Sequence, residues 1–312
     1  MLHYDDITLL PSYSEVSSRS EISLETKLGV RAFKLPVTPA NMKCVIDADT
    51  AFKLQDNNYF YVMHRFGNNF EFIERATDER WKNISISIGV QQEDRRFVKK
   101  LSNTHNIDYI TIDIAHGHCK AMKEMIFHIR ECYGKGIFII AGNIGTVDAY
   151  SDMAEWGVDA CKVGIGPGIA CTTKLKTGFY TPMFTTLVNI SEMKYATKGP
   201  AIIADGGIKH TGDIAKAIVG GADFVMVGGM FASCSDSPAS TDDKGNKVYF
   251  GSASSANKQT NTHIEGTTKY IPVESLTYLE KLQEIEQDLQ SASSYAGGKL
   301  SENTTVGYVH KA

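Results

Sequence analysis

Residues 162–178 have the sequence Lys162-Val-Gly-Ile-Gly-Pro-Gly-Ile-Ala-Cys-Thr-Thr-Lys-Leu-Lys-Thr-Gly178 and join an apolar run to a glycine-rich loop. Residues 160–165 predict a buried strand, which the glycines and proline from Gly164 onward end abruptly. Cys171 follows in a loop rich in backbone N–H donors, a setting that favours the nucleophilic thiolate. This stretch alone leaves two interpretations open, a nucleophile loop or a turn that carries a small buried cysteine.

Similar apolar runs, each ended by small or polar residues, occur on both sides of this stretch. Segments with helical periodicity separate them, for example residues 120–132, 146–155 and 211–219. Strands that alternate with helices predict a parallel sheet with crossover helices. We expect a closed (β/α)8 TIM barrel and not an open doubly wound sheet, because no GxGxxG with a downstream acid is present. The eight predicted strands are residues 34–37, 59–64, 84–90, 109–115, 137–142, 160–164, 201–204 and 224–228.

The chain changes character after the last predicted strand. Residues 233–247 are rich in Ser, Asp, Gly and Lys, and we expect a mobile flap with little that packs. Residues 275–291 carry apolar side chains at helical spacing, which predicts a C-terminal helix docked on the barrel. Because no repeat beyond the βα unit is present, residues 1–312 are expected to form a single domain.

Composition excludes several classes of protein. A length of 312 residues with 42% hydrophobic content suits one barrel, and a net charge of −4 without a basic tract argues against a nucleic-acid partner. Residues 1–10 lack the apolar core of a signal peptide, and no run approaches the roughly 20 apolar residues of a membrane span. Six cysteines without CxxC pairing indicate reduced thiols. We therefore expect a cytoplasmic protein without a membrane partner.

Catalytic groups in such a barrel collect where the strands end. Ala204-Asp-Gly-Gly-Ile208 and Val227-Gly-Gly-Met230 place paired glycines at the ends of the seventh and eighth strands. Barrel enzymes often bind a phosphate there through backbone N–H groups, so together the two motifs favour a small phosphorylated ligand. Glu265 contributes a carboxylate that, taken alone, predicts only a solvated loop.

In this order the motifs resemble those of the IMP dehydrogenase/GMP reductase family. The resemblance spans nearly the whole chain, and two features select its reductase branch. The third strand follows Phe66 within about 20 residues, too few for the CBS modules that typical dehydrogenases insert. The Arg-Tyr pair of the dehydrogenase flap has no evident counterpart in residues 233–268. The matching motifs include Tyr4-Asp-Asp-Ile7, Ser18-Arg-Ser-Glu21, Pro39-Ala-Asn-Met42, Asp113-Ile-Ala-His-Gly117, Gly164-Ile-Gly-Pro-Gly168, Ile202-Ile-Ala-Asp-Gly-Gly207 and Tyr249-Phe-Gly-Ser-Ala-Ser254.

The resemblance implies an NADPH-dependent oxidoreductase of purine salvage that deaminates GMP reductively to IMP and ammonia. Cys171 is implied to attack C2 of the purine and to form a covalent thioimidate as the amine leaves. Thr173 and Glu265 are implied to supply the proton that the amine requires. Two alternatives stay open: oxidation of IMP to XMP with NAD, as in an IMP dehydrogenase, and a nucleotide-binding barrel that acts as a scaffold or sensor without turnover.

Binding residues are also implied by the resemblance alone. Arg19 and Arg65 would suit the 2′-phosphate of NADPH, and the family precedent is a homotetramer. Ile169 departs from the family, since many members have a serine there. The GMP-binding set is Asp205, Gly206, Gly207, Gly228, Gly229, Gly251 and Gly266. The cofactor-binding set is Ser18, Arg19, Arg65, Asp113, Ile114, Ala115, Ile165 and Gly166. A monovalent cation site for K+ would use the carbonyls of Gly166, Gly168 and Cys171.

Overall fold

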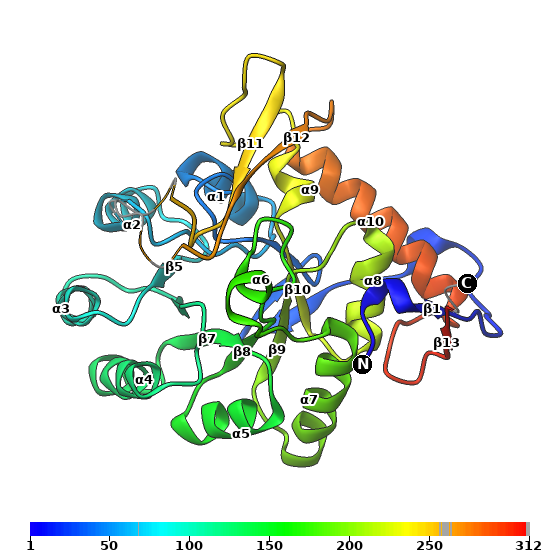
Figure 1. The fold of residues 1–312 in the computed structure, drawn as a ribbon, viewed down its shortest axis with the longest axis horizontal. Helices are drawn as coiled ribbons and strands as arrows, with labels where there is room; N and C mark the ends of the chain where they lie inside the picture. The colour runs from blue at the N-terminus through cyan, green and yellow to red at the C-terminus, as the bar shows by residue number, and fades with distance from the viewer. Residues whose placement is uncertain (68, 256, 258–261, 263, 310–312) are drawn as a thin grey trace.

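The computed structural model describes residues 1–312 except 68, 256, 258–261, 263 and 310–312. Its centre is a curled sheet of seven parallel strands in the order β4-β10-β9-β8-β7-β6-β5, with helices around the outside (Figure 1). This arrangement confirms the predicted α/β fold of the TIM-barrel type. The strands are β4 (Val37–Pro39), β5 (Ser85–Ile88), β6 (Tyr109–Asp113), β7 (Phe138–Ile144), β8 (Ala160–Val163), β9 (Ala201–Asp205) and β10 (Phe224–Val227).

Local sequence signals set the ends of the helices. At the start of α5, the Thr146 side chain accepts a hydrogen bond from the N–H of Ala149, and Gly157 in the left-handed conformation ends the helix.

Within the described ranges, no helix combines the length and apolar character of a membrane span. The helices are α1 (Ala48–Asp56), α2 (Asn69–Asp78), α3 (Gln92–Ser102), α4 (Lys120–Tyr133), α5 (Val147–Trp156), α6 (Thr173–Thr177), α7 (Met183–Thr197), α8 (Thr211–Val219), α9 (Gly229–Ala232) and α10 (Tyr278–Tyr295).

The predicted strand at residues 59–64 differs from expectation. Met63 pairs with Ile86 of β5 through an isolated parallel bridge, and the structure contains no regular ladder at this position in the part of the chain it describes. Pro39 of the neighbouring β4 has no N–H donor, and the carbonyl of Pro36 accepts instead from the N–H of Val225 of β10 at 2.8 Å. Seven strands instead of eight therefore form the regular sheet.

Aromatic side chains fill the barrel at the N-terminal ends of its strands. Phe60 lies at the centre of this cluster, and its ring centroid is 5.0 Å from that of Tyr109, 5.1 Å from Phe33 and 5.8 Å from Phe224. All four rings are buried. Phe33 belongs to a hairpin, β2 (Thr26–Leu28) and β3 (Arg31–Phe33), that precedes the sheet in the chain. This end of the barrel is therefore packed, and polar groups collect at the other end.

The segment after β10 packs more closely than expected. Lys247 is 5% exposed, and its Nζ donates to the carbonyls of Ser237 and Ala239 at 3.1 Å each and to that of Ser235 at 3.3 Å. The expectation that residues 233–247 contain little that packs is therefore wrong, because this buried ammonium organises the loop around itself. Lys247 lies on β11 (Asn246–Phe250), which pairs antiparallel with β12 (Thr268–Pro272).

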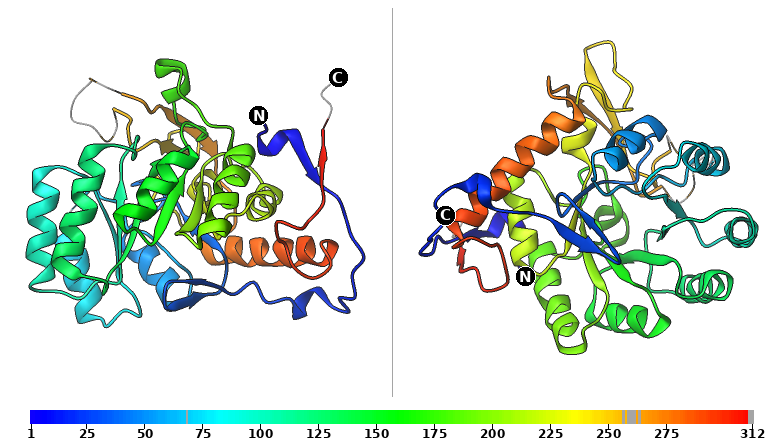
Figure 2. Two further views of the ribbon diagram at one scale, coloured as in Figure 1. Left: turned by 90° about the horizontal axis from the view of Figure 1, so that it is seen from below. Right: turned by 180° about the vertical axis from the view of Figure 1, so that it is seen from behind.

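The two ends of the chain lie side by side. β1 (Ile7–Leu9) pairs antiparallel with β13 (Val306–Tyr308), beside the long helix α10 (Figure 2). Preceding β1, the short 3-10 helix η1 (Tyr4–Asp6) contacts α8, and the carbonyl of Tyr4 accepts a hydrogen bond from Lys216 Nζ at 2.8 Å. The N-terminal segment is thereby held against the outside of the barrel.

The aromatic cluster generates a stability prediction. Replacing Phe60 by Ala leaves a cavity between the three remaining rings, so we expect the free energy of unfolding to fall by about 3–5 kcal/mol. Phe127 on α4 is 49% exposed, and Phe127→Ala should cost less than about 1 kcal/mol. Urea denaturation followed by circular dichroism measures both. Equal losses in the two variants would contradict the assigned role of the cluster.

Candidate functional site

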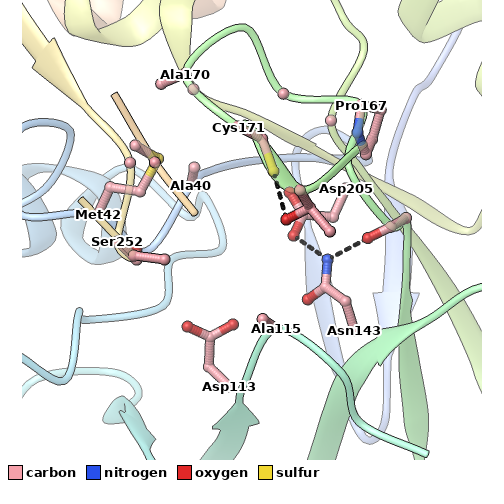
Figure 3. Close-up of a pocket in the computed structure, with 18 of the residues that line it drawn as sticks. Ala40, Met42, Asp113, Ala115, Asn143, Pro167, Ala170, Cys171, Asp205 and Ser252 are labelled. Carbon is pink, nitrogen blue, oxygen red and sulfur yellow. Dashed lines mark hydrogen bonds between the residues drawn. The ribbon is translucent and has the colours of Figure 1, made fainter. Parts of the chain in front are cut away.

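A cavity of about 350 Å³ opens at the C-terminal ends of the strands. Its lining comes from the ends of β4, β6, β7, β8, β9 and β10 and from the two loops that contain Cys171 and Glu265. In Figure 3, Met42 and Ser252 lie across the cavity from Asp205 and Asn143, with Cys171 between these two sides. Because parallel strands end at one edge of a sheet, residues far apart in the sequence meet here.

Three predicted catalytic residues form a chain of hydrogen bonds in this cavity. Cys171 Sγ donates to Thr173 Oγ1 at 3.2 Å, and Thr173 Oγ1 donates to Glu265 Oε2 at 2.6 Å. Cys171 ends the loop after β8, Thr173 is the first residue of α6, and Glu265 lies between β11 and β12. The structure thus brings the three predicted residues together as thiol, hydroxyl and carboxylate, which is a connected route for a proton.

Backbone pairing holds Glu265 beside the cysteine loop. The N–H of Thr172 donates to the carbonyl of Glu265 at 2.8 Å, and the N–H of Thr267 donates to the carbonyl of Ala170 at 2.8 Å. These bonds flank an isolated antiparallel bridge between Cys171 and Gly266. A Cβ at Gly266 would lie 2.9 Å from the backbone nitrogen of Ser254, so this close approach requires glycine.

A second polar cluster occupies the cavity floor around Lys162. Its Nζ lies 2.7 Å from Asp113 Oδ1 and 2.9 Å from Asp205 Oδ2, and Asn143 Nδ2 donates to the same Asp205 oxygen at 2.9 Å (Figure 3 shows this last bond). Burial alone would raise the pKa of Asp113, but the charge and hydrogen bond of Lys162, with smaller contributions from Arg65 and Asn41, together lower it. The two carboxylates in turn raise the pKa of Lys162 against the effect of burial. Asp113 and Lys162 are therefore both charged at neutral pH.

Lys162 and Asn143 carry no role in the sequence prediction. Lys162 stands between Cys161 and Val163, which are both fully buried strand residues. Because a lysine is rarely buried without a charged partner, its position in this apolar run could have indicated a functional role. Tyr249 also carries no role in the sequence prediction. Its hydroxyl donates to Met42 Sδ at 3.6 Å, and a Cβ added to Gly228 would lie 2.4 Å from this hydroxyl. The tyrosine hydroxyl thus faces the paired glycines at the end of β10.

Most of the residues implied for nucleotide and cofactor binding line the cavity. Gly207, Gly229 and Ile165 are adjacent to lining residues in the chain but do not line the cavity themselves, and the N–H of Ile165 donates to Thr181 Oγ1 at 3.0 Å. The implied residues that line it are Asp205, Gly206, Gly228, Gly251 and Gly266 for GMP, Arg65, Asp113, Ile114, Ala115 and Gly166 for the cofactor, and Gly166, Gly168 and Cys171 for the cation.

Ser18 and Arg19 lie apart from this cavity. Arg19, in the 3-10 helix η2 (Arg19–Glu21), donates from Nη1 to Ser291 Oγ at 3.2 Å, and its guanidinium lies 5.3 Å from the centroid of the Tyr295 ring. Both partners belong to α10, which packs against α8 on the outside of the barrel. The structure therefore does not bring these two residues to the cavity of their own chain.

His64, next to Arg65 at the cavity, is buried as a neutral ring. Its Nδ1 accepts a hydrogen bond from the N–H of Phe66 at 3.1 Å. Burial, and then the nearby charge of Lys43, lower the pKa of His64 to about 4. Protonation of His64 would place a cation in a buried site and would break the hydrogen bond from the N–H of Phe66.

Comparisons with known proteins agree with this geometry. The family model "IMP dehydrogenase / GMP reductase domain" matches residues 1–302. A protein named GMP reductase from Mesoplasma florum is 45% identical over 314 residues, covering 98% of this chain and 96% of its own length. Proteins of the same name from Leptothrix cholodnii and Shouchella clausii are 46% and 44% identical, each over 98% of this chain and 94% of their own length.

The neutral state of His64 predicts a pH dependence of stability. Above pH 6.5 the ring is neutral in both states, and between pH 6.5 and about 4 only the unfolded chain takes up the proton. The free energy of unfolding should therefore fall in this window by up to about 3 kcal/mol on account of His64. Urea denaturation at pH 7, 6 and 5 measures this loss, and His64→Gln should remove it. An identical pH slope in the parent and this variant would refute the assignment.

Proposed function

The chain belongs to the IMP dehydrogenase/GMP reductase family, and from that premise we infer that it is a reductase that converts GMP to IMP and ammonia. The observation that carries this conclusion is the hydrogen-bonded series Cys171, Thr173 and Glu265 in the cavity. The relatives named GMP reductase match 98% of the chain, and they disfavour the IMP dehydrogenase alternative. The intact series of three groups also argues against a barrel that binds nucleotide without turnover.

The first chemical step uses these three groups. Cys171 Sγ forms a bond to C2 of the purine, and the bond between C2 and the exocyclic amine breaks with its electron pair on nitrogen. The thiol proton moves through Thr173 to Glu265. From this pair it passes to the departing amine, which leaves as ammonia. Cys171 then holds the purine as a thioimidate. When bound, a reduced nicotinamide supplies the hydride that replaces sulfur at C2.

The cavity residues fit a nicotinamide cofactor, and we propose that it is NADPH. Asp113 and Arg65 line the cavity together with Cys171, so a carboxylate for ribose hydroxyls and a guanidinium for phosphate lie within the same space. Arg65 is exposed, as a residue at the entrance that meets a 2′-phosphate would be. Ser18 and Arg19 can contact the cofactor only in another copy of the chain. This requirement supports the proposal of an oligomer, and its number of four subunits rests on the family resemblance.

Further features of the proposal rest on the family resemblance. We propose a cytoplasmic enzyme whose residues 1–312 form one catalytic domain without CBS modules. The carbonyls of Gly166, Gly168 and Cys171 are proposed to hold K+, and the Gly168 carbonyl that accepts the N–H of Cys171 at 3.0 Å keeps a second lone pair for it. The flap expected at residues 233–247 lies within the described residues, and its motion stays a prediction.

The proposed reaction can be tested directly. Purified protein with GMP and NADPH should lose the near-ultraviolet absorbance of the reduced nicotinamide and release equal amounts of IMP and ammonia. Cys171→Ala removes the nucleophile, so turnover should fall by roughly four orders of magnitude or more. Cys132→Ala, a cysteine of α4, is the control and should retain activity. IMP formation at the parent rate by folded Cys171→Ala would overturn the mechanism, and reduction of NAD with IMP would favour the dehydrogenase.

Glu265 can be tested by removing its charge alone. Glu265→Gln keeps the shape but cannot take the proton from Thr173, so we expect kcat to fall about 10²–10⁴-fold with a smaller change in the KM for GMP. Thr173→Val interrupts the same route and should give a loss of the same order. Glu302→Gln, at an exposed glutamate, is the matched control. A parent-like kcat in Glu265→Gln would show that another group moves the proton.

A further inference from the structure

Lys162 occupies an unusual place for a lysine. It lies on β8, the central strand of the seven, and is 3% exposed between Cys161 and Val163, which are fully buried. An ammonium in such surroundings is costly unless charged partners compensate for its lost hydration. The proposed chemistry of Cys171, Thr173 and Glu265 makes no use of it. Its role must therefore come from the groups that it contacts.

The two partners of Lys162 come from strands on either side of β8. Asp113 is the last residue of β6, and Asp205 is the last residue of β9. The ammonium lies 2.7 Å from the first carboxylate and 2.9 Å from the second. Both aspartates line the cavity, where Asp113 belongs to the set implied for the cofactor and Asp205 to the set implied for GMP. One cation thus joins the two proposed binding subsites.

Gly142 provides the space for this bridge. In the sheet register Asp113 lies opposite Gly142 of β7, and Gly142 lies opposite Lys162. With strands about 4.8 Å apart, Asp113 and Lys162 are separated by roughly 10 Å of backbone. A Cβ at Gly142 would lie 2.5 Å from the Cβ of Lys162. The absence of a side chain on the intervening strand therefore leaves the lysine side chain free to cross to Asp113.

The contacts also orient the Asp205 carboxylate. Its Oδ2 accepts from both Lys162 Nζ and Asn143 Nδ2, and Asn143 Nδ2 donates in addition to the carbonyl of Gly164 at 2.8 Å. Two donors on one oxygen hold the carboxylate plane and leave the capacity of Oδ1 for a ligand hydroxyl. The ribose of GMP has two neighbouring hydroxyls that can donate in this way.

We propose that Lys162 is a positioning residue that orients Asp205 toward the GMP ribose and Asp113 toward the cofactor, and so couples the two subsites; this proposal rests on the proposed function. Without the ammonium, the two partly buried carboxylates lose the donor that they share and repel each other, so neither keeps its orientation toward its ligand. Both affinities then fall together, because one ammonium contacts both carboxylates. The reacting groups around Cys171 stay in place.

Lys162→Met tests this proposal, because it removes the charge and keeps most of the side-chain volume. We expect the KM values for GMP and for NADPH each to rise roughly tenfold or more, with a smaller change in kcat. Lys281→Met is the matched control. Lys281 is also buried and lies between two carboxylates, 2.6 Å from Glu274 and 2.5 Å from Glu284, but on α10 outside the cavity. This control should leave both KM values unchanged.

Rescue by a small cation separates positioning from a general loss of packing. Lys162→Ala leaves space beside the cavity, and ethylammonium chloride should restore both KM values toward those of the parent. Sodium chloride at equal ionic strength should not. Equal KM values with the two salts would show that the ammonium itself is not what the site requires.

A charge-balanced variant keeps the test decisive if Lys162→Met does not fold. Lys162→Met with Asp113→Asn retains the parent's excess of one negative charge in the cluster, and Asp205 still lacks its lysine donor. The KM for GMP should stay raised in this double variant. A parent-like KM for GMP in either folded variant overturns the proposal. Failure of the parent itself to consume GMP and NADPH refutes the proposed function instead, so the two outcomes are distinguishable.

Discussion

Backbone pairing between the cysteine loop and the segment around Glu265 is the interaction on which the rest of the site depends. The bonds from Thr172 to Glu265 and from Thr267 to Ala170 hold two loops together. They bring Thr173 beside Glu265, which is 92 residues away in the sequence. Because the main chains are joined, the Glu265 carboxylate lies 2.6 Å from the Thr173 hydroxyl. Little conformational entropy is then lost when these groups come together for reaction. The distance between the Cys171 thiol and the Glu265 carboxylate is thus set by the backbone and not by side-chain rotamers alone.

The two ends of the barrel differ: one end is filled by packed side chains, and the other contains the polar cavity. At the N-terminal ends of the strands, Phe33, Phe60, Tyr109 and Phe224 fill the interior with packed rings. At the C-terminal ends, glycines and charged side chains leave a cavity of about 350 Å³. A packed interior below a polar cavity gives the charged groups a rigid floor, which limits how far Lys162 and its two carboxylates can move.

The α/β fold of the TIM-barrel type and the proximity of Cys171, Thr173 and Glu265 could be predicted from the sequence, whereas several other placements could not. Lys162 appeared as part of an apolar run, and only the sheet register shows that Gly142 lets it reach Asp113. Ser18 and Arg19 were grouped with the cofactor residues because motifs carry no information about distance. Residues 233–247 have a loop composition, and nothing local indicates that Lys247 is buried among their carbonyls.

The sequence by itself determined the alternation of strands and helices, the glycine-rich ends of the strands and the presence of a cysteine, a threonine and a glutamate in recognisable motifs. These properties are local, since each depends on a few neighbouring residues and their periodicity. Only the tertiary structure decided which charges face one another, that residues 59–64 join the sheet through a single bridge, and that Glu265 reaches Thr173. The physical reason is that ion pairs and hydrogen bonds require contact within about 3 Å, and distance in the sequence does not set distance in space.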